Sequence, residues 1–188
     1  MHPDRLVIGI SGASGAIYGI RLLEVLRNSG IESHLVISKS AGIAMKEETG
    51  KSVSEVKALA SVSYSTDDVG AAIASGSFRT RGMIVAPCSV KTLGEIANGI
   101  TPTLLPRAAD VVLKERRRLV LMVRETPLHL GHLRNMCAVT EMGAIVAPPV
   151  PGFYSGATTI EEMVDQTVGR VLDLFDIDLG LVKRWKEE

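Results

Sequence analysis

Aromatic residues, cysteines and net charge are all scarce in this sequence. Phe, Trp and Tyr together make up 4% of its 188 residues, and 21 Lys and Arg residues balance 21 Asp and Glu residues. A general nucleic-acid binder needs a basic excess, so we expect no nucleic-acid partner. The two cysteines, Cys88 and Cys137, lie far apart without metal-ligand spacing. This argues against a disulfide framework and a zinc site, and it fits a reducing compartment.

Long apolar runs are also lacking, and we expect no signal peptide. No apolar run approaches the ~20 residues of a membrane span. Residues 1–5 lead directly into a short apolar run and show no leader pattern. We therefore expect residues 1–188 to form a single domain that works in the cytoplasm without a membrane partner.

The sequence does contain a regular alternation of short apolar runs and longer amphipathic stretches. The runs are apolar throughout, which is typical of parallel strands covered on both faces; they span residues 6–10, 34–37, 83–86, 119–123 and 144–147. Apolar residues recur at helical spacing in 16–28 and 158–176. The alternation predicts a doubly wound α/β fold with a parallel sheet. Residues 50–80 give no clear pattern because Ser, Ala and Gly dilute it.

A glycine-rich loop, Gly9-Ile-Ser-Gly-Ala-Ser-Gly-Ala16, follows the first run. Ligands of doubly wound sheets bind outside the carboxyl ends of the strands, where such glycines let backbone N–H groups approach a phosphate. The spacing differs from the dinucleotide fingerprint, and no Lys-Ser or Lys-Thr pair follows as in a triphosphate loop. The loop therefore predicts a nucleotide or flavin site. The alternative is a plain strand-to-helix turn with Ser14 as the N-cap.

Hydroxyl groups follow the second and third runs. Ser38 stands where an NAD site usually has an acidic residue that binds the ribose hydroxyls. The lack of this acid argues against NAD and leaves room for a ribityl chain, whose hydroxyls Ser38 could bind. A role as a helix N-cap explains Ser38 equally well. Ser89 and Thr92 are placed at a helix start as candidate anion or carbonyl ligands. Cys88 beside them is expected to be a buried small hydrophobe rather than a nucleophile.

A basic segment runs from Arg107 to Arg124, with six basic residues against two acidic ones. A solvated helix face explains most of it. Arg124 and Glu125 differ because they end a strand, where a guanidinium suits a phosphate and a carboxylate can move a proton.

The loop 148–154 presents Tyr154, whose phenol can hydrogen-bond a phosphate oxygen, while Phe153 is expected to serve packing. We assign the histidines no catalytic role and predict no metal.

Together, these motifs resemble the UbiX/Pad1 family of flavin prenyltransferases. The resemblance rests on residues 12–16, 38–39, 88–93, 107–117, 124–128 and 151–154, and it continues to 184–185. It implies Rossmann-like, flavodoxin-like subunits in large homo-oligomers, typically dodecamers. It also implies metal-independent transfer of a dimethylallyl group from dimethylallyl phosphate to N5 and C6 of reduced FMN. The product would be the cofactor of a UbiD-type decarboxylase, in ubiquinone biosynthesis or aromatic-acid decarboxylation. Arg118 stands where many relatives have Pro, which we interpret as a surface change.

The resemblance also implies roles for individual residues. FMN would be bound by Gly12, Ala13, Ser14, Ser38, Ser89, Val90, Lys91, Thr92, Arg107 and Arg124. The allylic phosphate would be surrounded by Lys114, Arg124, Glu125, Tyr154 and Arg170. The catalytic set would be Ser14, Glu48, Lys114, Glu125 and Trp185, with Glu48 assisting proton removal and Trp185 lining the prenyl site. The C-terminal helix and tail, about 158–188, would contribute to the oligomer and the prenyl site.

Two other interpretations are open on the residues alone. An FMN-dependent cysteine decarboxylase would carry an early catalytic His and an Asn-bearing motif, and the sequence shows neither. A non-catalytic flavin carrier would commonly sandwich the ring between aromatics and carry an acidic surface, whereas this chain is poor in aromatics and neutral. The sequence also leaves open whether the donor is a monophosphate or a diphosphate.

Overall fold

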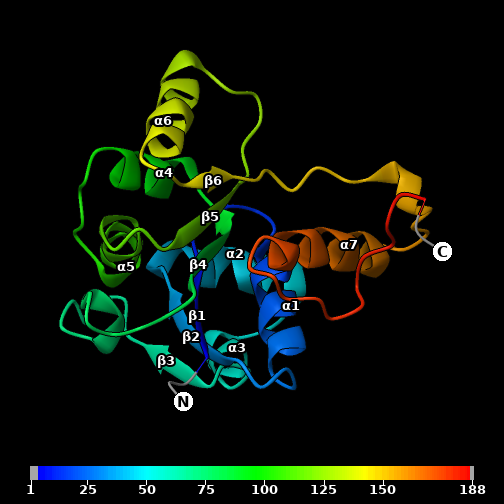
Figure 1. The fold of residues 1–188 in the computed structure, drawn as a ribbon, viewed down its shortest axis with the longest axis horizontal. Coiled ribbons are helices and arrows are strands. Elements are labelled where there is room, and N and C mark those ends of the chain that lie inside the picture. The colour runs from blue at the N-terminus through cyan, green and yellow to red at the C-terminus, as the bar shows by residue number, and fades with distance from the viewer. Residues whose placement is uncertain (1–3, 187–188) are drawn as a thin grey trace.

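A six-stranded, all-parallel β-sheet forms the centre of the computed structural model, which describes residues 4–186 (Figure 1). Its strands are β1 (Arg5–Ile10), β2 (Glu32–Ile37), β3 (Val62–Tyr64), β4 (Gly82–Cys88), β5 (Arg118–Val123) and β6 (Ile145–Val146). Their order is β3-β2-β1-β4-β5-β6. The chain thus builds outward from β1 in one direction and then from β4 in the other. Sheets of this kind open a ligand crevice at the carboxyl ends of the two strands where the direction changes, here β1 and β4.

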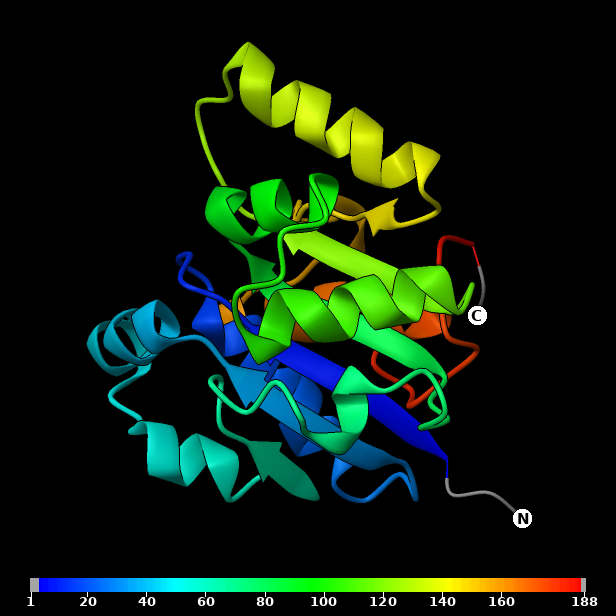
Figure 2. The same ribbon diagram turned by 90° about the vertical axis from the view of Figure 1, so that its left-hand side faces the viewer.

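Helices cover both faces of the sheet (Figure 2). They are α1 (Ala16–Leu26), α2 (Lys39–Thr49), α3 (Val53–Lys57), α4 (Val90–Ala97), α5 (Leu104–Lys114), α6 (Leu130–Glu141) and α7 (Ile160–Asp173), with the 3-10 turns η1 (Ala72–Ala74) and η2 (Phe153–Ser155). Leu6, Ile8 and Ile10 of β1 pack toward the core shared with α1 and α7, whereas Val7 packs toward the core shared with α5. Both faces of β1 are therefore apolar, and the predicted doubly wound parallel sheet is confirmed.

The segment without a clear pattern, residues 50–80, holds α3, β3 and η1. β3 is a three-residue edge strand, and its Val62 and Ser63 are exposed. A strand this short and this exposed lacks the apolar run from which a strand can be predicted. All five runs expected to be strands are strands, and the two helical patterns correspond to α1 and α7.

After β6 the chain leaves the sheet as an extended arm, residues 147–156, that ends in η2 (Figure 1). Phe153 on this arm is 84% exposed and Val150 is 74% exposed. The expectation that Phe153 serves packing is therefore wrong within the chain, because the arm extends away from both cores. Beyond α7 the tail turns back toward η2, so Trp185 lies beside Tyr154 of the arm (Figure 1).

Arg118 is exposed, which agrees with a surface change. Its Nη1 atom donates to the carbonyl of Leu174 and faces Asp176 Oδ2 at 3.6 Å, so it ties the start of β5 to the end of α7. Within residues 4–186, the helices are too short or too polar for any of them to cross a membrane.

Candidate functional site

The loops that follow β1 and β4 are joined by one buried hydroxyl, that of Ser11. Its Oγ donates to the carbonyl of Pro87 at 2.9 Å and accepts from the backbone N–H of Ser89 at 2.7 Å. Ser11 is 1% exposed. Sequence reasoning included Ser11 in the glycine loop but gave it no role, because its partner lies 76 residues away. This contact fixes the two walls of the switch-point crevice relative to each other.

The glycine loop packs tightly against the start of α2. A Cβ on Gly12 would lie 2.2 Å from Ser40 Oγ and 2.6 Å from Ser40 Cβ, so only glycine fits there. Gly15 is the N-cap residue of α1, with φ of 103° and no side-chain cap. The alternative that made Ser14 this cap is wrong, because the turn needs a left-handed residue one position later.

Glu48, from the end of α2, caps α1 in place of Ser14. Its Oε2 accepts from the backbone N–H of Gly15 at 2.8 Å and of Ala16 at 3.2 Å. Burial alone would raise the pKa of Glu48. Hydrogen bonds from the Ser14 hydroxyl and the two amides, with the nearby charge of Arg124, outweigh burial and lower that pKa below its usual value. Glu48 is therefore an ionised group held at the glycine loop at neutral pH.

Two further helices begin at the same edge of the sheet, each capped by a serine. Ser38 accepts from the N–H of Ala41 at 3.2 Å at the start of α2. Ser89 accepts from the N–H of Thr92 at 3.2 Å at the start of α4, and its hydroxyl donates to Thr92 Oγ1 at 3.2 Å. The helix-cap interpretation of Ser38 is confirmed. Both helix N-termini favour an anion in the crevice between them.

Arg124 and Glu125 follow β5 directly, as the run of apolar residues predicted. The N–H of Arg124 donates to the Cys88 carbonyl at 3.0 Å, which continues the pairing of β4 with β5. The charge of Arg124 acts on both Glu48 and Tyr18. Burial raises the pKa of Tyr18, and Arg124 partly offsets this rise. Tyr18 thus lies at the site. Sequence reasoning missed it because nothing distinguishes Tyr18 from the other residues of an amphipathic helix.

Cys88 is wholly buried, and burial raises the pKa of its thiol far above the ordinary range. The expectation of a small hydrophobe is confirmed. Lys91 extends into solvent, where it pairs with Glu95 at 2.7 Å. Arg107 pairs with Asp110 at 3.0 Å on the half-exposed face of α5.

Lys114 lies at the opposite edge of the sheet from Arg124. It ends α5, just before β5 begins, and its Nζ contacts Glu115 beside Gly76. Arg124 follows the other end of β5, and the six residues of that strand span about 20 Å. A single chain therefore does not bring Lys114 to the carboxyl edge.

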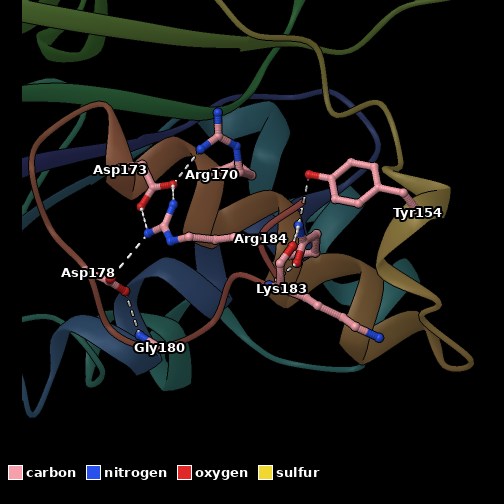
Figure 3. A network of polar contacts seen from close by, with 8 residues as sticks. Tyr154, Arg170, Asp173, Asp178, Gly180, Lys183 and Arg184 are labelled. Atoms are coloured by element: carbon pink, nitrogen blue, oxygen red, sulfur yellow. Dashed lines mark hydrogen bonds and ion pairs between the residues drawn. The ribbon is translucent and has the colours of Figure 1, made fainter. Parts of the chain in front are cut away.

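Tyr154, Arg170 and Trp185 form a separate group, which we call the tail group. Figure 3 shows two of its members, Tyr154 and Arg170. The rings of Tyr154 and Trp185 meet edge to face with centroids 5.5 Å apart. Both rings and Arg170 line a cavity of about 260 Å³, with Val182 and Arg184. Arg170 belongs to the last turn of α7, and the Phe175 carbonyl just beyond accepts from Arg81 at 2.9 Å, at the amino edge of the sheet. The tail group is thus set apart from the glycine loop of its own chain.

The carboxyl edge fits a flavin mononucleotide by the chemistry of its groups. The N-termini of α2 and α4 offer backbone N–H groups to a phosphate, and Ser38 and Ser40 offer hydroxyls 3.2 Å apart to a ribityl chain. Among residues 4–186, His, Cys, Asp and Glu form no group of three or more that could hold a metal ion.

The fold and this edge define a flavoprotein. In agreement, the family model described as Flavoprotein matches residues 1–172.

The comparisons with known proteins identify the family more closely. The flavin prenyltransferase UbiX of Thauera aromatica is 57% identical over 181 residues, which cover 96% of this chain and 93% of the relative. The structure of AnUbiX in complex with FMN and dimethylallyl pyrophosphate superposes with a TM-score of 0.97 at 51% identity, over 100% of both chains. A dodecameric FMN-dependent UbiX-like decarboxylase from Escherichia coli O157:H7 has a TM-score of 0.95 at 47% identity, over 97% of this chain and 100% of that one. The chain belongs to the UbiX family of flavin prenyltransferases.

Proposed function

We propose that this protein transfers a dimethylallyl group from dimethylallyl phosphate to N5 and C6 of reduced FMN. One observation carries the proposal: the switch-point edge joins a glycine loop, two serine-capped helix N-termini, the ionised Glu48 and Arg124. Bound at this edge, reduced FMN supplies the electron-rich ring that accepts the prenyl group. Membership in the UbiX family favours this activity over a cysteine decarboxylase or a flavin carrier.

In this proposal FMN lies along the crevice between β1 and β4. Its phosphate takes backbone N–H groups near Ser89 to Thr92, and its ribityl hydroxyls face Ser38. Gly12, Ala13 and Ser14 contact the flavin from the glycine loop. Lys91 and Arg107 contribute least through their side chains, since both side chains already pair with acids on their own helices.

The donor phosphate needs more positive charge than the carboxyl edge of one chain supplies. Arg124 is at that edge, whereas Lys114, Tyr154 and Arg170 are not. We infer that neighbouring copies complete the site, with the exposed arm and tail reaching across the subunit boundary. The dodecameric assembly of the E. coli relative supports this inference. In such an assembly, residues 158–188 serve both the oligomer and the prenyl site.

The proposed chemistry follows from where the charges are. Breaking the allylic C–O bond places negative charge on the phosphate, and the cationic Lys114, Arg124 and Arg170 stabilise the leaving group. Glu48 is ionised and is held beside Ser14, so it can accept the proton lost as the second bond to the ring forms. Glu125 follows Arg124 and is exposed, so it can relay a proton from solvent water to the departing phosphate. Trp185 lines the prenyl site and helps to exclude water from the allylic cation.

We propose the monophosphate as the preferred donor. A monophosphate is a poorer leaving group than a diphosphate, and its departure would be stabilised by the positive charge that Lys114, Arg124 and Arg170 supply together in the assembled site. We further propose that prenylated FMN passes to a UbiD-type decarboxylase in the cytoplasm.

The experiment is mass spectrometry of the flavin released after anaerobic incubation with reduced FMN and either dimethylallyl phosphate or the diphosphate. We expect the monophosphate to raise the flavin mass by one prenyl unit, and Arg124→Ala to abolish the gain. Unchanged FMN with both donors would overturn the transferase. A gain with the diphosphate alone would overturn only the choice of donor.

A further inference from the structure

The C-terminal tail is fastened to α7 by one buried side chain, Gln166. Its Oε1 accepts from the backbone N–H of Lys183 at 2.8 Å, and its Nε2 donates to the carbonyl of the same residue at 3.1 Å. The side-chain amide thus pairs with both backbone polar groups of Lys183, as a neighbouring strand would. The tail also lies close on the helix, since a Cβ on Gly169 would lie 2.5 Å from Val182.

The same amide reaches the arm. Gln166 Nε2 lies 3.4 Å from the Tyr154 hydroxyl, which accepts its second N–H. Trp185 follows Lys183 by two residues, and its ring meets that of Tyr154. One side chain therefore links the two segments that carry the aromatic members of the tail group.

Packing alone does not explain a glutamine at this position. Gln166 is 5% exposed, and the other buried residues of α7 are apolar apart from Gly169. Burying an amide is unfavourable unless its hydrogen bonds are made, so an apolar side chain would serve better if only volume mattered. Here both ends of the amide have partners, and all of those partners belong to the arm and the tail.

A second contact fixes Arg170 beside these rings. Asp173 accepts from Arg170 at 2.6 Å, and its two oxygens each accept from Arg184 at 2.9 Å (Figure 3). Arg184 directly follows the residue that Gln166 binds. The register that Gln166 imposes on Lys183 therefore also sets where Arg184 meets Asp173, and so where the Arg170 guanidinium is held.

We propose that Gln166 is a positioning residue for the prenyl donor: it fixes Tyr154 and Trp185 relative to Arg170. The inference rests on the proposed function, because it takes the tail group as part of the donor site. Gln166 acts through these three residues and does not itself touch the donor.

The test compares Gln166→Met, which keeps the length of the side chain and removes all three hydrogen bonds, with three other proteins. Gln166→Glu keeps the acceptor for Lys183 and loses the donor. Val168→Ala weakens the opposite, core-facing side of α7 without touching the tail. Tyr154→Phe removes only the hydroxyl. The readouts are KM for dimethylallyl phosphate, kcat, FMN affinity, tryptic cleavage after Lys183 or Arg184, and fluorescence anisotropy of Trp185, the chain's single tryptophan.

For Gln166→Met we expect lower Trp185 anisotropy, faster tryptic cleavage in the tail and a rise of about tenfold or more in donor KM, because small misplacements of binding groups are costly. FMN affinity should stay near wild type. Gln166→Glu should fall between Gln166→Met and wild type. Tyr154→Phe should raise donor KM while the tail stays ordered.

The proposal is overturned if Gln166→Met matches Val168→Ala in every readout, or if it leaves donor KM unchanged while the tail is freed. Failure of the proposed function is a different result. In that case wild type yields no prenylated flavin, while the anisotropy and cleavage measurements still report whether Gln166 holds the tail.

Discussion

At the scale of single residues, Glu48 has the most unusual surroundings of any carboxylate at the proposed site. It serves as the cap of α1 and stands beside Ser14 and Arg124. Two roles meet in one group, since the carboxylate stabilises a helix N-terminus and is also the proposed acceptor of the ring proton. Both roles require the ionised form.

We expect Glu48→Gln to lower prenylated-FMN formation by about 100-fold or more, because proton transfer by a positioned group contributes at least that much. FMN affinity should change little, since the amide keeps the size of the side chain. Steady-state formation of product and FMN titration measure the two effects. Equal losses in both would contradict a role in proton transfer.

The pH dependence follows from the lowered pKa of Glu48. The carboxylate stays ionised below its usual value of 4.5, so the acidic limb of the pH–rate profile should lie below 4.5. The capping contribution to stability has the same sign. It is fully present above the unfolded-state pKa and is lost as the pH falls through the lower folded-state pKa. An acidic limb above 4.5 would show that another group limits the rate.

The residues of the carboxyl edge could be expected from sequence because each directly follows an apolar run. Ser38, Ser89 and Arg124 are of this kind. Glu48 could not be placed by the same reasoning, because its contact with Gly15 spans 33 residues and depends on how α2 returns to the loop. The prediction that Phe153 serves packing is wrong because apolar side chains usually pack in a core, whereas the arm that carries Phe153 extends away from the core and leaves the ring exposed.

At the scale of elements, the strands could be predicted because both faces of the sheet are covered, which makes each inner strand apolar throughout. The edge strand β3 lacks this signature. Capping residues mark the starts of the helices, and only some of these residues lie at the proposed flavin site. Ser89 begins α4 at the proposed flavin site, whereas Thr159 begins α7 with a capping box that involves Glu162.

This difference predicts unequal consequences for two similar substitutions. Ser89→Ala and Thr159→Ala should each lower the free energy of unfolding by about 1 kcal/mol, the usual contribution of such a cap. Only Ser89→Ala should weaken FMN binding as well, because its cap shapes the proposed phosphate-binding turn. Urea unfolding and FMN titration of both variants check this. If the Ser89→Ala and Thr159→Ala variants bound FMN with equal affinity, the proposed position of the FMN phosphate at the start of α4 would be contradicted.

At the scale of the whole molecule, the proposed donor site is divided. The carboxyl-edge residues of one chain lie a strand length away from Lys114, and the tail group is set apart. This separation could not be predicted from sequence, because the motifs do not show at which edge of the sheet their residues lie. Only the positions of α5 and α7 on the sheet reveal it.

A mixing experiment tests whether copies share a site. Lys114→Ala and Arg124→Ala should each be inactive alone. When the two are dissociated, mixed in equal amounts and reassembled, about a quarter of the sites should regain both side chains, given random assembly into a symmetric oligomer. Activity should therefore reappear at about that fraction of wild type. A mixture that stays inactive while forming mixed oligomers would place both residues in the same chain's site.

The Ser11 contact between the two crevice loops has a consequence for how quickly a flavin binds. Because one buried hydroxyl joins both walls, the crevice takes its shape when the chain folds, and little ordering remains to be done when the ligand arrives. Association then needs only diffusion and orientation, so flavin binding should proceed in one kinetic phase whose rate grows linearly with flavin concentration.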